Sequence, residues 1–217
     1  MTSATSALRI LLADDHEVVR RGLRQLLRAQ SSWEVVDEAT TGREAVEKSE
    51  QLKPDVVILD IGMPVLNGLE ATRQIHASLP RTEILILTMN DSEQLMRSVL
   101  DAGAHGYLLK SDAGHDLVAA VNSLREHRPF FTSKVARMVL QGFLSASKDG
   151  ATDPLTGRER IIVQLLAEGR SNKEVATELG LSVKTAETHR ANIMRKLDLQ
   201  GTSDLVHYAV RNCIIVP

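Results

Sequence analysis

The sequence predicts an α/β domain with a doubly wound, five-stranded parallel sheet, followed by a linker and a small all-α domain. Between Leu8 and about His127, short apolar segments of strand length alternate with longer amphipathic segments. Strict alternation of this kind produces right-handed crossovers and a parallel sheet that is covered on both faces. After Pro154 only helical patterns remain. We therefore expect domains at residues 1–128 and 153–217, and a linker with one short helix at residues 129–152.

Composition excludes several classes of protein. The chain has 217 residues, of which 43% are hydrophobic and 25% charged, so it is not disordered throughout. No apolar run approaches the roughly 18 residues of a membrane-spanning helix, and the first residues do not resemble a secretory signal. The single cysteine, Cys213, excludes an internal disulfide and a multi-thiolate metal site. We expect a cytoplasmic protein that does not bind a membrane.

The α/β domain is predicted from apolar runs and helical spacing. The five predicted strands span Leu8–Ala13, Glu34–Ala39, Val56–Leu59, Ile84–Leu87 and Gly106–Leu109. The second strand is the least apolar, which places it near an edge of the sheet. The predicted helices span His16–Ala29, Gly42–Leu52, Gly68–Ser78, Ser92–Ala102 and Asp116–Glu126. Each carries apolar residues at three- and four-residue spacing, as Val19, Leu23 and Leu26 do in the first.

The composition and the pattern of apolar residues change after Arg128. Pro129 ends the preceding helix, Lys134–Leu144 has the pattern of one short amphipathic helix, and Ser145–Asp153 has the small, polar composition of a flexible linker. Four further helices are predicted at Thr156–Glu168, Ser171–Leu179, Val183–Leu197 and Ser203–Asn212. The first two begin with the Thr/Ser-x-x-Glu pattern of a capping box.

Polar side chains follow four of the predicted strands. Asp14 and Asp15 end the first strand, Asp60 the third, Thr88 the fourth and Lys110 the fifth. Ligands of doubly wound sheets bind beyond the carboxyl ends of the central strands. Three converging carboxylates repel one another unless a hard divalent cation neutralises them, and we expect Mg²⁺. With a hydroxyl and an ammonium, such a pocket suits phosphoryl transfer to an Asp oxygen. The alternative is that each Asp merely caps the next helix.

The first domain resembles the receiver domain of two-component response regulators, a flavodoxin-like fold. The segments that carry the resemblance are Leu12–His16, Leu59–Gly68, Leu87–Thr88 and Gly106–Lys110. The resemblance implies that Asp60 accepts a phosphoryl group from a sensor histidine kinase. It also implies that Asp15, Asp60 and the Gly62 carbonyl bind Mg²⁺, with Asp14 contributing largely through water. Thr88 and Lys110 would contact the phosphoryl group, and Tyr107 would act with Thr88 as a switch. A buried Tyr107 without a switching role is the alternative.

The segment Ser171–Leu197 has the spacing of a helix-turn-helix, with a break at Gly180–Ser182. Residues 1–128 carry 14 Lys and Arg against 19 Asp and Glu, whereas Arg170–Lys196 carries six against three. This asymmetry suggests two modules with different partners, and the basic segment suits contacts with DNA phosphates. A solvated amphipathic hairpin would show nearly the same pattern.

Residues 155–215 resemble the LuxR-type DNA-binding domain through Leu155–Glu159, Gly169–Ala176 and Ser182–His189. The whole chain is therefore similar to response regulators of the NarL/FixJ type. This implies that a first group of side chains faces base edges, namely Lys184, Glu187, Thr188 and Ala191. It implies that a second group lies near phosphates, namely Asn172, Lys173, Thr185, His189 and Arg195. The last helix would pair two subunits on promoter DNA.

The leading hypothesis is a transcription regulator, not an enzyme, whose dimerisation and binding to double-stranded promoter DNA are controlled by phosphorylation of Asp60. A rival is a Mg²⁺-dependent hydrolase with an aspartyl-phosphate intermediate. Such an enzyme usually needs an acid/base Asp two residues after the nucleophile, where this chain has Gly62. A third hypothesis keeps DNA binding but makes the first domain a phosphorylation-independent dimerisation module.

Overall fold

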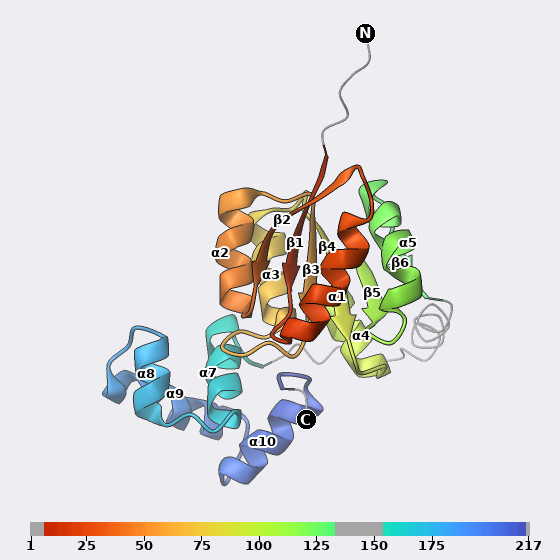
Figure 1. Cartoon of the computed structure of the whole chain (residues 1–217). Coiled ribbons are helices and arrows are strands. Elements are labelled where there is room, and N and C mark those ends of the chain that lie inside the picture. Colours follow the sequence, from red (N-terminus) through yellow and green to blue (C-terminus); the bar gives the residue numbers. More distant parts are fainter. Residues whose placement is uncertain (1–6, 133–153, 216–217) are drawn as a thin grey trace.

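The computed structural model describes residues 7–132 and 154–215 and shows an α/β domain followed by a helical domain (Figure 1). The predicted linker helix at Lys134–Leu144, and most of the predicted linker at residues 129–152, lie outside the described residues. Among the helices that the structure describes, none has the length and apolar character needed to cross a membrane.

The α/β domain is built on a parallel sheet with the strand order β2-β1-β3-β4-β5-β6. The strands are β1 (Leu8–Ala13), β2 (Trp33–Ala39), β3 (Val56–Asp60), β4 (Glu83–Thr88), β5 (Gly106–Leu109) and β6 (Phe130–Phe131). The predicted doubly wound sheet is confirmed, and β2 lies at an edge as expected. Strand β6, which pairs in parallel with β5, has no counterpart among the five predicted strands. Two residues are too short a run to show a strand pattern, so only the pairing reveals this strand.

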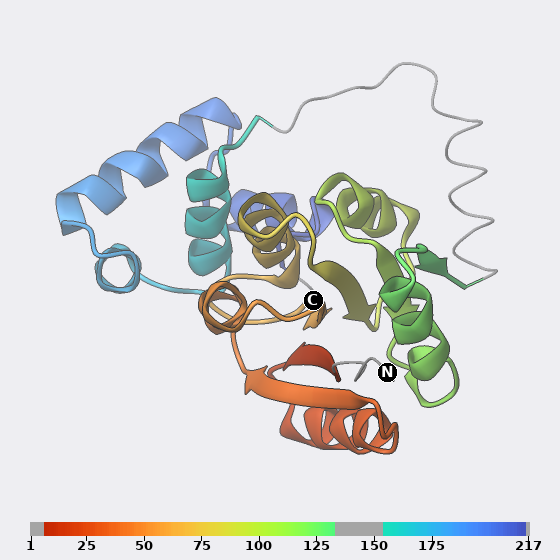
Figure 2. The ribbon, with the colours of Figure 1, turned by 90° about the horizontal axis from the view of Figure 1, so that it is seen from above.

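Helices cover both faces of the sheet (Figure 2). They are α1 (Glu17–Arg28), α2 (Gly42–Leu52), α3 (Gly68–Ser78), α4 (Glu93–Asp101) and α5 (Ala113–Arg125). One core cluster joins α1 and α5 to one face of the sheet through residues such as Leu27 and Val121. A second cluster joins α2, α3 and α4 to the other face and continues into the helical domain.

The helical domain consists of α7 (Gly157–Ala167), α8 (Asn172–Glu178), α9 (Val183–Lys196) and α10 (Thr202–Arg211). Both predicted capping boxes are present, at Thr156 before α7 and at Ser171 before α8. Gly169 and Gly180 follow these two helices with φ of 87° and 63°, a left-handed conformation that glycine adopts without steric cost. Helices α7 and α10 lie next to the carboxyl ends of the strands (Figure 1).

The turn after β3 is packed so closely that it requires glycine at the first position of α3. A Cβ added at Gly68 would lie 2.0 Å from the carbonyl oxygen of Asp60. The Gly68 N–H also donates a hydrogen bond to the Ile61 carbonyl at 3.0 Å. The start of α3 is therefore held directly against the backbone of the last residue of β3.

We predict that Gly68→Ala lowers the free energy of unfolding by about 2 kcal/mol or more, because the backbone must shift to accept the methyl group. Urea denaturation of the full chain measures this. The control is Gly22→Ala in α1, where nothing lies within 4 Å of the added Cβ. There the better helix propensity of alanine should raise stability by roughly 0.5–1 kcal/mol. Equal effects of the two substitutions would contradict the steric explanation.

Candidate functional site

Three carboxylates converge at the carboxyl edge of the sheet. Asp14 and Asp15 follow β1, and Asp60 is the last residue of the adjacent strand β3. Asp14, Asp15, His16 and Asp60 each offer a ligand atom, and these atoms all lie within 4.8 Å of one another. Asp14 is completely buried and Asp60 is 4% exposed. The predicted acidic pocket is therefore present as a physical cluster, with two of its carboxylates removed from solvent.

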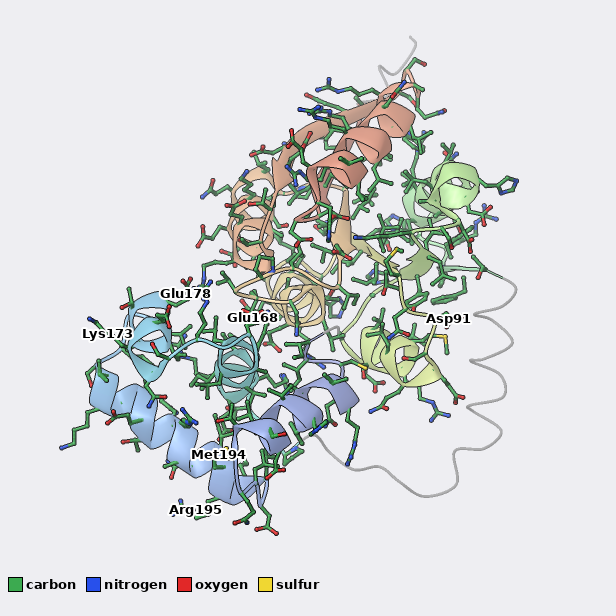
Figure 3. The ribbon with its side chains drawn as sticks, turned by 60° about the horizontal axis from the view of Figure 1, so that its bottom comes forward. Asp91, Glu168, Lys173, Glu178, Met194 and Arg195 are labelled. Atoms are coloured by element: carbon green, nitrogen blue, oxygen red, sulfur yellow. The ribbon has the colours of Figure 1, made fainter. Side chains whose placement is uncertain are left out.

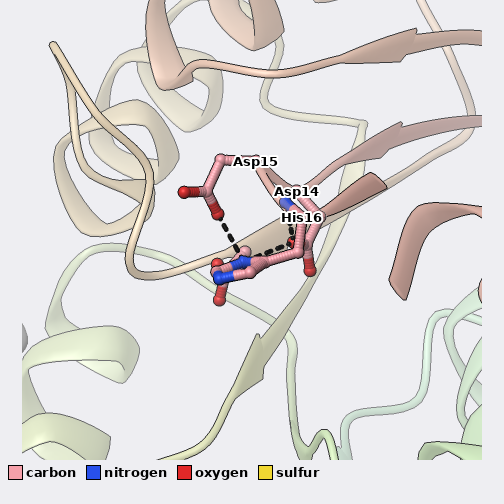
Figure 4. Close-up of side chains that lie close together, drawn as sticks. Asp14, Asp15 and His16 are labelled. Atoms are coloured by element: carbon pink, nitrogen blue, oxygen red, sulfur yellow. Dashed lines mark hydrogen bonds and ion pairs between the residues drawn. The ribbon is translucent and has the colours of Figure 1, made fainter. Parts of the chain in front are cut away.

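His16 is a member of this cluster that is not among the predicted site residues. Its Nδ1 atom lies 2.7 Å from Asp15 Oδ1 and 3.3 Å from Asp14 Oδ1 (Figure 4). The signal in the sequence was its position, because His16 directly follows the two aspartates at the end of the first predicted strand. The ring is largely exposed, so His16 lies at the mouth of the pocket while Asp14 lies on its floor.

Lys110, which follows β5, supplies the positive charge of the pocket. Its Nζ atom lies 2.8 Å from Asp14 Oδ2 and 3.0 Å from Asp60 Oδ2. Burial alone would lower the pKa of Lys110, but the hydrogen bond to Asp14 and the charge of Asp60 outweigh it and raise this pKa. The lysine is therefore firmly protonated, and one ammonium is shared by two buried carboxylates.

Burial and the neighbouring charges also shift the pKa of Asp60. Burial raises the pKa of this carboxyl group above its usual value; the charge of Lys110 opposes the shift and the charge of Asp14 adds to it. The backbone N–H of Gly62 also donates to the Asp60 carboxylate and favours its ionised form. The pocket holds three carboxylates and one ammonium, which pairs with Asp14 and Asp60, so it carries excess negative charge. Hard carboxylate oxygens with excess negative charge are a suitable donor set for Mg²⁺.

Thr88 and Tyr107 meet at the loop after β4. Thr88 ends β4, and its hydroxyl accepts a hydrogen bond from the backbone N–H of Asn90 at 3.1 Å. Tyr107 on β5 is 1% exposed, and its hydroxyl donates to the carbonyl of Asn90. Burial and the nearby charge of Asp91 raise the pKa of Tyr107. The two predicted switch residues are thus joined through Asn90, which the sequence analysis did not include.

The predicted DNA-contacting side chains lie on α8 and α9. Most are solvent-exposed: Lys173, Lys184, Thr185, Glu187, Thr188, Ala191 and Arg195. Asn172 and His189 are half-buried, whereas Ala186 and Ile193 are buried and face the domain core. Figure 3 shows Lys173 and Arg195 at the outer side of the helical domain, away from the sheet. The residues Lys184, Glu187, Thr188, Ala191 and Arg195 form one solvent-facing row along α9, which we call the reading stripe.

Two family models match the chain in the same order as its two domains. Residues 10–122 match the response regulator receiver domain, and residues 153–209 match the LuxR family of bacterial regulatory proteins. The chain belongs to the LuxR family of bacterial response regulators. This membership confirms the resemblance drawn from the sequence and makes the protein a DNA-binding transcription regulator.

Several relatives align with this chain over nearly its whole length. The oxygen regulatory protein NreC of Staphylococcus carnosus is 40% identical over 215 residues, covering 96% of this chain and 99% of the relative. The RcsB response regulator of Salmonella typhimurium has a TM-score of 0.59 at 27% identity, covering 95% of this chain and 99% of that one. ChrA, a response regulator of a heme-sensing two-component system, has a TM-score of 0.53 at 33% identity, covering 97% and 100%. RcsB has also been solved in complex with DNA.

We predict that Lys110→Met lowers the free energy of unfolding of this response regulator by about 3 kcal/mol at neutral pH, because it leaves two buried carboxylates without a cation. Protonation of those carboxylates removes the penalty, so the difference from wild type should shrink as the pH falls. Urea denaturation at several pH values measures this. The control is Lys48→Met, which loses a more exposed pair with Asp37. A pH-independent difference would contradict the electrostatic cause.

Proposed function

We propose that this response regulator accepts a phosphoryl group on Asp60 from the phosphohistidine of a sensor kinase, and that phosphorylation controls its dimerisation and its binding to promoter DNA. The observation that carries this proposal is the pocket at the strand ends of the receiver domain, where Asp14, Asp15 and Asp60 converge and Lys110 pairs with Asp14 and Asp60. An aspartate that served only as a helix cap would not need a buried lysine shared with a neighbouring aspartate.

The chemistry follows from the positions of these groups. An Asp60 oxygen attacks the phosphorus atom, a P–O bond forms, and the P–N bond to the kinase histidine breaks. Mg²⁺ would be held by Asp15, Asp60 and the Gly62 carbonyl, with Asp14 acting through water, and would neutralise charge on the transferred group. The Lys110 ammonium and the Thr88 hydroxyl contact the phosphoryl oxygens and stabilise the charge that develops there.

Thr88 also provides the route by which phosphorylation changes the receiver domain. Its hydroxyl is bonded to the N–H of Asn90, and Tyr107 is bonded to the carbonyl of the same residue. When the Thr88 hydroxyl turns toward a phosphoryl oxygen, its bond to Asn90 is lost and the loop after β4 is released. Tyr107 then repacks with that loop. Phosphorylation is thus a local change of charge at Asp60 that shifts the loop after β4 and Tyr107 from one arrangement to another.

We propose that the protein acts in the cytoplasm as a regulator without catalytic turnover. The position two residues after Asp60 is Gly62, which offers no side chain to activate water for rapid hydrolysis of an aspartyl-phosphate. A covalent adduct that persists long enough to control DNA binding is the expected product.

We predict that acetyl phosphate with Mg²⁺ adds the mass of one phosphoryl group to the full-length protein. Intact-mass spectrometry measures the adduct, which should disappear with Asp60→Asn and on chelation of Mg²⁺. Asp37→Asn, at an exposed position on β2, is the matched control and should be phosphorylated as wild type is. An adduct that survives in Asp60→Asn would show that another residue is the acceptor. The absence of any adduct would support a phosphorylation-independent receiver domain.

For DNA binding, we propose that α9 enters the major groove. Lys184, Glu187, Thr188 and Ala191 would face base edges, and Glu187 would accept a hydrogen bond from an amino group such as that of cytosine. The flanking residues Asn172, Lys173, Thr185, His189 and Arg195 would contact phosphates and set the position of the helix on the duplex. The exposure of the reading stripe supports this assignment.

We predict that Lys173→Ala weakens binding to all DNA sequences by a similar factor and reduces the slope of log K against log salt concentration by about one. Fluorescence anisotropy with a specific and an unrelated duplex, at several salt concentrations, measures both quantities. Lys48→Ala removes a lysine from the receiver domain and should leave the slope unchanged. Loss of affinity for one duplex alone would show that Lys173 reads bases rather than phosphate.

A further inference from the structure

Val183 is the first residue of α9, and this large apolar side chain is 43% exposed. The core clusters of the described residues do not include it. Among the described residues, the other exposed large hydrophobic side chains, Val18 and Met89, both lie in the receiver domain. An exposed valine means little by itself, since folded proteins expose many apolar atoms. The significance of Val183 comes from its position in the helical domain.

The start of α9 is complete without Val183. Ser182 caps the helix, because its hydroxyl oxygen accepts a hydrogen bond from the Thr185 N–H at 3.0 Å. A β-branched side chain loses rotamer freedom in a helix, so helix propensity does not favour valine there. Neither the cap nor the core therefore explains a valine at this position, and replacing it should leave the domain folded.

Val183 lies at the N-terminal end of the helix that the proposed function places in the major groove. In a helix-turn-helix, the N-terminal residues of the second helix contact base edges. Helix α9 lies at the outer side of the helical domain, away from the sheet (Figure 3). Val183 and its neighbour Lys184 are both exposed there. In that mode of binding, Val183 enters the groove together with the reading stripe.

The polar side chains in the first two turns of α9 differ in whether their groups are already used. The Thr185 hydroxyl pairs with the Ser182 hydroxyl at 2.7 Å. The Thr188 hydroxyl donates to the Lys184 carbonyl at 2.9 Å. Glu187 is exposed, and within residues 7–132 and 154–215 its carboxylate makes no hydrogen bond or ion pair. Glu187 is therefore a free acceptor on the face that meets the DNA.

Glu187 restricts the bases that α9 accepts. A carboxylate is repelled by the DNA phosphates and offers only acceptors, so it needs a hydrogen-bond donor on a base edge. In the major groove these donors are the N4 amino group of cytosine and the N6 amino group of adenine. Adenine also presents the N7 acceptor beside its donor, which repels a carboxylate, whereas cytosine does not. Glu187 therefore favours cytosine.

Val183 has one apolar counterpart in the major groove, the C5-methyl group of thymine. Val183 and Glu187 are four positions apart, so they lie on the same side of α9 and about 6 Å apart along its axis. Successive base pairs are about 3.4 Å apart along the duplex. The two side chains therefore face bases that are one or two steps apart.

We infer that Val183 is a specificity-determining residue, and that Val183 and Glu187 together read a thymine and a cytosine on one DNA strand, one or two steps apart. Val183 packs on the thymine methyl group, and Glu187 accepts a hydrogen bond from the cytosine N4 amino group. The inference rests on the proposed entry of α9 into the major groove. It extends base reading to a residue outside the reading stripe and names the bases that are read.

The first test is selection from a pool of duplexes with a randomised segment, using the full chain with and without acetyl phosphate and Mg²⁺. Wild type should enrich thymine and cytosine on one strand, one or two steps apart. Glu187→Gln should prefer adenine at the cytosine position by at least about tenfold, because an amide matches the N6 and N7 groups of adenine. The matched control is Glu178→Gln, which removes the same charge from an exposed position on α8 and should keep cytosine.

The second test measures the thymine methyl group directly. Fluorescence anisotropy compares the selected duplex with the same duplex in which deoxyuridine, which lacks the methyl group, replaces that thymine. Wild type should bind the deoxyuridine duplex about fourfold more weakly, the effect of exposing one buried methyl group. Val183→Ser should bind both duplexes equally, because the two changes remove the same contact. Val18→Ser, at the exposed valine of α1, should keep the fourfold difference.

Two results overturn the inference while leaving the proposed mode of DNA binding intact. In the first, wild type enriches a defined sequence, but Val183→Ser still distinguishes thymine from deoxyuridine as wild type does, or wild type does not distinguish them. In the second, Glu187→Gln enriches the same bases as wild type. If wild type enriches no sequence under either condition, the proposed base reading by α9 fails and the inference fails with it.

Discussion

The pairing of one buried ammonium with two buried carboxylates is the interaction on which the site depends. Lys110, Asp14 and Asp60 come from three strands, and the parallel sheet brings their ends to one edge. Removing charges from water has a large free-energy cost, and pairing offsets only part of it. Because two carboxylates face one ammonium, the strand ends keep a net negative charge. In the proposed function, that charge favours a divalent cation, which would neutralise the charge of the incoming phosphoryl group and so allow a carboxylate oxygen to approach it.

Much of this arrangement was predictable because it depends on order along the chain. A strand ends where its apolar run ends, so the sequence alone predicts that Asp14, Asp60, Thr88 and Lys110 lie at one edge of the sheet. The capping boxes at Thr156 and Ser171 were also predictable, because in each box the capping residue and its glutamate partner lie within four positions of each other. The resemblance to receiver and LuxR-type domains added roles for these residues, and the family matches confirm that both domain types are present.

The features that the sequence did not predict are those that join distant segments. Phe130 pairs with Gly106, and Gln164 bonds to Asn67 across almost a hundred positions of the chain, so neither contact leaves a periodic pattern. Asn90 was not identified because only its backbone joins Thr88 to Tyr107. Any residue type supplies those two backbone groups. Long-range packing, rather than local propensity, produces all three features: the strand pairing, the Gln164–Asn67 hydrogen bond and the link through Asn90.

The exposure of α9 determines where the control of this regulator must operate. Since solvent reaches the reading stripe in this structure, α9 needs no movement of the receiver domain to enter a major groove in the proposed mode of DNA binding. In that mode, phosphorylation would have little influence on how fast a promoter is found. Its influence would fall on how long a copy stays, which depends on the dissociation rate and on how many copies bind together on the duplex.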